Sequence, residues 1–122
     1  MSGLNNFNAV ALVNEARTAT TTVDLKNSSG KGCHVIIDMT AVTGTGSVTP
    51  TIQGLDKASG KYYTLLVGAA IVGISTVVLR VYPDLTPSAN LIADEIVPGE
   101  FRVLMTHVNG VAMTYSVGVN IV

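Results

Sequence analysis

The clearest alternation of hydrophobic and polar residues in this chain lies between positions 33 and 66. Val35 and Ile37 fall on one face of a first predicted strand, with polar side chains on the other face. A Gly-rich loop at 44–47 and a turn at 56–61 separate two further runs that are rich in β-branched and aromatic residues. The stretch therefore predicts three strands of a half-buried antiparallel sheet.

Alternating patterns continue along the rest of the chain and predict strands rather than helices. The predicted strands cover residues 18–25, 33–40, 47–55, 62–67, 75–82, 101–108 and 111–122. In the longest connection, Ser88–Ala93 can form at most one helical turn. Evenly spaced short strands without longer helices are typical of an all-β fold, here an antiparallel β-sandwich (Ig-like or jelly-roll-like) of about seven or eight strands.

The alternation also predicts which side chains face the interior. Apolar residues at every second position of a strand share one face, and in a sandwich that face packs against the opposing sheet. The residues expected between the two sheets are Val35, Ile37, Ile52, Leu79, Val103, Tyr115 and Val117.

The dipeptide Asn109-Gly110 separates the last two predicted strands. A type I′ turn requires positive φ at two successive residues, which asparagine and glycine tolerate. The pair therefore predicts a tight hairpin that joins the two strands.

Two interpretations of the first residues stay open. Residues 1–16 are either an N-terminal arm or the first strand of the sandwich, and residues 17–122 form a single β-sandwich domain. An apolar run in the first segment is the candidate partner-binding site, because an unpaired apolar strand can add to the edge of a neighbour's sheet. Its residues are Val10, Ala11, Leu12 and Val13.

Composition restricts the classes of partner. Charged residues make up 12% of the 122 residues, against about 25% in a typical soluble domain. A net charge of −1 provides neither a basic field for nucleic acid nor a polybasic anchor for a membrane. The low charge predicts that other protein covers much of the surface, and a neutral, hydroxyl-rich surface is the alternative.

The run Thr64–Leu79 contains no charged residue. It is shorter than the roughly 20 apolar residues that a membrane-spanning helix needs. It also contains Gly68 and Gly73 together with many β-branched residues. Two strands joined by a Gly-Ala turn therefore fit the run better than a membrane helix.

Cys33, His34 and His107 are the first candidates for chemistry. Cys33 and His34 are adjacent on a predicted strand, so their side chains point to opposite faces and cannot act as a nucleophile and base. The two histidines lie on different strands, and no third ligand follows at metal-binding spacing. We expect Cys33 to be a small core residue and both histidines to be structural.

Glycine-rich turns and loop acids are the remaining candidates. Gly60-Lys61 lacks the spacing of a phosphate loop and is followed by tyrosine rather than serine or threonine. Asp94, Glu95 and Glu100 lie close together in the chain but are expected to be solvated loop acids. The sequence thus predicts no catalytic residue, no cofactor and no metal site.

Four stretches carry a resemblance to a known group of proteins. They are Gly32-Cys33-His34-Val35-Ile36-Ile37-Asp38-Met39-Thr40, Ser47-Val48-Thr49-Pro50-Thr51-Ile52-Gln53-Gly54, Ser59-Gly60-Lys61-Tyr62-Tyr63 and Tyr115-Ser116-Val117-Gly118-Val119-Asn120. In these stretches the chain resembles small virion proteins of tailed bacteriophages, and most of all the head decoration (capsid cement) proteins.

That resemblance implies a non-enzymatic, structural role. Such a protein is made in the host cytoplasm, binds the outside of the assembled capsid, and bridges and stabilises major capsid subunits. The implied partners are the major capsid protein and further copies of the chain, as a trimer or dimer, without nucleic acid or membrane. A tail or neck component of the virion is one alternative. A receptor- or carbohydrate-binding module and a small enzyme are alternatives from other classes.

Overall fold

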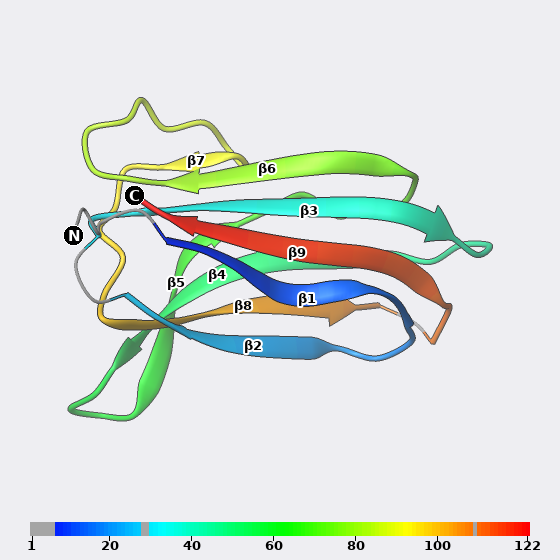
Figure 1. Ribbon diagram of the computed structural model, residues 1–122, viewed down its shortest axis with the longest axis horizontal. Coiled ribbons are helices and arrows are strands. Elements are labelled where there is room, and N and C mark those ends of the chain that lie inside the picture. The colour runs from blue at the N-terminus through cyan, green and yellow to red at the C-terminus, as the bar shows by residue number, and fades with distance from the viewer. Residues whose placement is uncertain (1–6, 28–29, 109) are drawn as a thin grey trace.

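The computed structural model describes residues 7–27, 30–108 and 110–122, which form nine strands and no helix. The strands build two sheets, with the orders β1-β9-β3-β6-β7 and β2-β8-β4-β5 (Figure 1). Their bounds are β1 (Phe7–Arg17), β2 (Thr21–Lys26), β3 (Cys33–Val42), β4 (Val48–Asp56), β5 (Lys61–Val67), β6 (Ser75–Val81), β7 (Ile92–Ala93), β8 (Glu100–His107) and β9 (Met113–Ile121). The predicted all-β sandwich is therefore confirmed.

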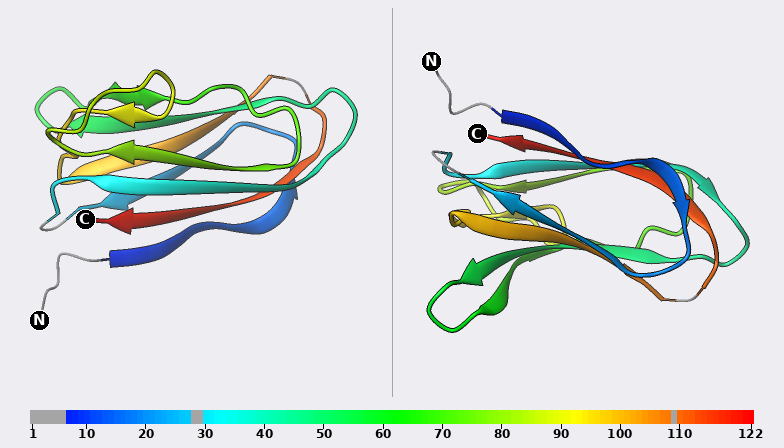
Figure 2. Two further views of the ribbon diagram at one scale, coloured as in Figure 1. Left: turned by 90° about the horizontal axis from the view of Figure 1, so that it is seen from above. Right: turned by 60° about the horizontal axis from the view of Figure 1, so that its bottom comes forward.

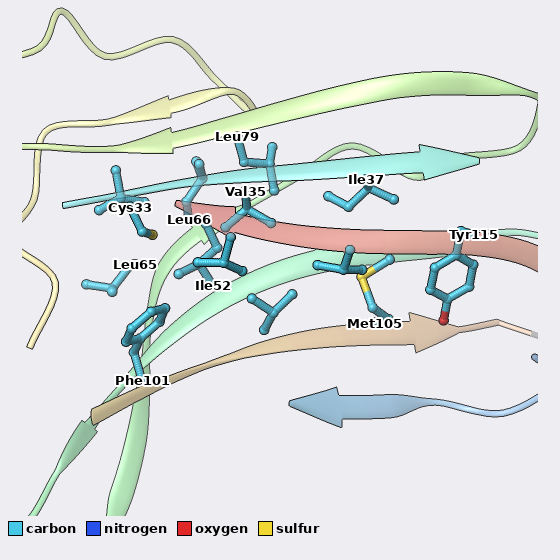
Figure 3. Packing of buried hydrophobic residues seen from close by; sticks show 14 of the residues in the cluster. Cys33, Val35, Ile37, Ile52, Leu65, Leu66, Leu79, Phe101, Met105 and Tyr115 are labelled. Carbon is cyan, nitrogen blue, oxygen red and sulfur yellow. The ribbon is translucent and has the colours of Figure 1, made fainter. Parts of the chain in front are cut away.

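Alternation along the strands produces the core between the two sheets. On β9, every second residue from Met113 to Ile121 is buried, and the residues between them are half-buried. The other long central strands repeat this period, because successive side chains of a strand point to opposite faces. Figure 3 shows the resulting layer of side chains from both sheets. All seven predicted core residues are buried: Val35, Ile37, Ile52, Leu79, Val103, Tyr115 and Val117.

The strand count exceeds the prediction because of β7. The segment considered for a helical turn instead makes a turn in which the N–H groups of Leu91 and Ile92 donate to the carbonyl of Ser88. The chain then runs parallel to β6 for two residues, Ile92 and Ala93. A strand of two residues is too short to have a periodic pattern, so the sequence did not predict it.

The connections from β3 to β4 and from β8 to β9 lead from one sheet to the other. The sequence pattern had predicted that each of these two strand pairs lies within one sheet. β3 pairs with β6 and β9, whereas β4 pairs with β5 and β8. β8 and β9 also belong to different sheets, so the strands on either side of Asn109-Gly110 do not form the predicted hairpin. The turn geometry itself rests on Asn109, which lies outside the described residues.

The two sides of the sandwich differ in how they are closed. On one side, the edge strands β1 and β2 follow each other directly in the chain, one in each sheet (Figure 2). On the other side, residues 68–74 lead from β5, the edge of one sheet, to β6 near the edge of the other. Within this loop, Ile71 makes an isolated bridge with Val48 of β4.

Candidate association surfaces

The predicted partner-binding run forms part of the edge strand β1. Val10 lies opposite Gly118 of β9, and its side chain is outside the described residues. Ala11 and Leu12 are partly buried and pack against the core of their own sandwich. Among the three side chains of the run that the structure describes, that of Val13 is largely free, with 59% of it exposed. Ala11 and Leu12 are therefore already engaged within the chain, and their role in partner binding stays a prediction.

The C-terminal half of β1 is bulged, and the guanidinium of Arg17 donates hydrogen bonds to its backbone carbonyls. The register against β9 shifts between Leu12 and Glu15. There Arg17 donates to the carbonyl oxygens of Val13 at 2.7 Å, Glu15 at 3.1 Å and Tyr115 at 2.7 Å. Bulges and side chains that occupy edge carbonyls make a strand a poor template for further pairing. This half of β1 is thus blunted as an edge.

Two strongly exposed apolar side chains lie instead on the loop between β5 and β6. Val72 is 66% exposed and Ile74 is 74% exposed, although Ile71, which precedes Val72, is buried. Together with Leu91, they line an open cavity of about 360 Å³. We call this surface the loop patch and define it by these three side chains. Exposed apolar groups that gather around a hollow are typical of binding surfaces.

Neighbouring backbone contacts hold the loop patch in place. Ile71 exchanges two backbone hydrogen bonds with Val48, of 2.8 and 3.1 Å, and its own side chain is buried. Asn90 donates its side-chain amide to the carbonyl of Val67 at 3.1 Å, which ties the loop before β7 to the end of β5. The patch therefore rests on a fixed frame between the two sheets.

The sequence prediction of binding residues did not include the loop patch. In the sequence, the loop patch was indicated by the charge-free run Thr64–Leu79, which was considered only as a membrane helix or as two strands. The two strands are confirmed, since β5 and β6 occupy the two ends of the run, but they belong to different sheets and do not pair with each other. An uncharged connection between two strands could have indicated an interaction surface.

A polar contact inside the sandwich joins the two sheets at the β8–β9 end. The hydroxyl of Tyr115 on β9 lies 2.9 Å from Nε2 of His107 on β8; Figure 3 shows that hydroxyl directed toward β8. The guanidinium of Arg17 lies 4.9 Å from the centre of the tyrosine ring. Burial, with a contribution from Arg17, lowers the pKa of His107 below its usual value of 6.5. Nδ1 of His107 is buried without a hydrogen-bond partner among the described residues.

Folding should therefore become less favourable as the pH falls through about 6.5. With its pKa lowered, folded His107 binds a proton more weakly than unfolded His107, so the unfolded state takes up more protons in that range. Stability is then complete above about pH 6.5 and decreases with acidification. Denaturant unfolding at several pH values should show this slope, and His107→Gln should reduce it.

His34 supplies the control for that measurement, because burial and Arg80 lower its pKa as well. His34→Gln removes a histidine from the outer face of its sheet, where it lies 3.2 Å from the amide of Asn120. If His107→Gln left the slope unchanged while His34→Gln removed it, the dependence would not come from the Tyr115 contact.

The other candidate residues do not assemble into a site. Cys33 is a buried core residue, as expected, and burial raises its pKa to about 12. His34 and His107 lie on strands of different sheets. Glu100 pairs with Lys57 at 3.2 Å, and Asp94 accepts the backbone N–H of Asp84 at 2.7 Å. Within the described ranges, no three histidine, cysteine or acidic side chains gather closely enough to hold a metal ion.

The remaining observations concern membranes and known proteins. The described part of the chain contains no helix of the length and apolar character needed to cross a membrane. Comparison with known proteins gives no match to a family description, to a curated protein or to a solved structure.

Proposed function

We propose that this chain is a structural protein of a phage virion, which binds the outside of the assembled capsid and bridges neighbouring major capsid subunits. The resemblance to head decoration proteins suggests this role. The observation that carries the proposal is the loop patch, where Val72 and Ile74 expose most of their apolar surface. A capsid surface would remove these side chains from water.

The low charge of the chain supports the same role. Burial of apolar area stabilises association by about 25 cal/mol per Å² before the costs of ordering. Few charges would have to lose their hydration at such an interface, since only 12% of the residues are charged. The lining of the cavity, residues 69–75, 77, 90 and 91, contains no charged side chain at all.

A single charge in the loop patch should prevent attachment. Val72→Asp places a carboxylate where the partner would cover the side chain, and burying an unpaired charge is costly. We expect the affinity for capsids of the encoding phage to fall about tenfold or more. Sedimentation of the purified protein with capsids that lack it measures this change.

Val108→Asp is the matched control, because Val108 is 69% exposed and lies on the connection between β8 and β9. The same substitution there should leave attachment unchanged. Equal losses in both variants would remove the loop patch from the interface. Attachment to tails rather than capsids, as seen by electron microscopy, would favour a tail or neck component. Binding to a soluble sugar without particle binding would contradict the proposal.

A further inference from the structure

Next to the loop patch, β6 has an edge that its neighbour covers only in part. β7 pairs with Arg80 and Val81 alone. The N–H of Arg80 donates to the carbonyl of Leu91 at 2.9 Å, and the N–H of Tyr82 donates to the carbonyl of Ala93 at 3.1 Å. Figure 1 shows β7 beside only the C-terminal end of β6. The remaining part, Ser75–Val78, has no strand on this side among the described residues.

The backbone of this remaining part is oriented for pairing. Backbone groups of a strand point alternately to its two sides. Because Arg80 and Tyr82 donate toward β7, the N–H and C=O groups of Thr76 and Val78 point to the same side. The residues between them face β3, which lies along the whole length of β6. Two residues of β6 thus direct their donors and acceptors away from their own sheet.

The cavity of the loop patch lies against this edge. Its lining includes Ser75 and Val77 of β6, Leu91 before β7, and residues 69–74 of the loop. A strand placed beside Thr76 and Val78 would bond to their backbone, and its inward side chains would enter the cavity. Strand addition combines these two contributions: main-chain bonds supply affinity, and pockets for alternate side chains supply specificity.

We infer that the free part of β6 accepts an extended, uncharged segment of a partner protein, with apolar residues at alternate positions. The inference rests on the proposed function and names the kind of capsid segment that would bind. The absence of charged side chains from the cavity lining selects an uncharged segment, because a charge there would be desolvated without a counter-charge.

A flexible segment fits this place better than the sheet edge of a second copy. The free part is four residues long, from Ser75 to Val78, with Leu91 at one end and the loop 69–74 at the other. A whole sheet edge carries its own neighbouring loops and has little room there. The other long edge strands of the chain also carry charges, at Glu15, Arg17, Asp24, Lys26 and Lys61.

Amide hydrogen exchange followed by NMR tests the inference on the intact chain. The probe is a short peptide of alternating valine and threonine, capped at both ends. At a concentration ten times its Kd, it should slow exchange of the Thr76 and Val78 amides about tenfold. The amides of Val77 and Leu79 face β3 and serve as internal references. Peptides N-methylated at alternate amides, in both registers, and a peptide with aspartate in place of valine should not slow it.

The other outcomes test the inference and the proposed function separately. Binding without slower exchange at Thr76 and Val78, or equal binding of the N-methylated peptides, would exclude strand addition at β6. Slower exchange that appears with rising protein concentration, without peptide, would make a second copy the occupant. If Val72→Asp abolishes capsid attachment while no peptide binds, the proposed function stands and strand addition fails. If the peptide binds at β6 but the protein does not attach to capsids, strand addition is confirmed and the capsid role fails.

Discussion

Replacing Ile37 by alanine should lower the free energy of unfolding by about 2–5 kcal/mol, the range found for large-to-small substitutions in protein cores. Ile37 is fully buried in the middle of β3, between Val117 of β9 and Val77 of β6. Both neighbouring strands hold the backbone, so the surroundings can collapse only partly into the space that the side chain leaves. Chemical denaturation with a two-state fit measures the change.

Ile74→Ala is the control for this prediction, because the side chain of Ile74 is mostly exposed. Its stability should stay within about 0.5 kcal/mol of the unchanged protein, as for most surface substitutions. A loss of less than about 0.5 kcal/mol for Ile37→Ala would contradict the assignment of this face of β3 to the core.

Replacing Gly32 by alanine should destabilise the protein by about 1–3 kcal/mol or more, through overpacking. A Cβ atom at Gly32 would overlap the backbone carbonyl oxygen of Val81 and would also crowd Tyr82. Gly32 has little freedom to move away, since its N–H and carbonyl both bond to the backbone of Val122. The added methyl group must therefore distort the ladder where β3, β6 and β9 meet.

Gly118→Ala provides the comparison, because a Cβ atom at Gly118 meets nothing within 4 Å. Gly118 lies within β9, so both substitutions change a glycine that lies in or beside the same sheet. Thermal and denaturant unfolding should separate the two variants clearly. Similar stabilities for both would show that the approach of Gly32 to Val81 is not tight in solution.

Strands and their faces could be predicted from the sequence because alternation is a local property. Val35 and Ile37 face the core for the same reason that His34 does not: successive side chains of a strand point to opposite sides. The same argument placed Tyr115 and Val117 of β9 correctly. One apolar face on each strand then requires a second layer, so a sandwich follows from the pattern.

Sheet membership could not be predicted, because it depends on the direction that each connection takes in space. Residues 43–47 lead from β3 across to the other sheet, although two alternating runs joined by a short Gly-rich loop resemble a hairpin. The hairpin predicted from Asn109-Gly110 was wrong for the same reason. In the structure, β9 instead lies between β1 and β3, which pair with both of its edges.

For the candidate binding surface too, the sequence determined some features and the tertiary structure decided others. Composition established that the run between β5 and β6 is uncharged and apolar. It did not reveal which of its side chains would be free. Tertiary structure decided this through the backbone bridge between Ile71 and Val48, which draws Ile71 into the core. Val72 and Ile74, on either side of a glycine, face the solvent, where we propose that a partner covers them.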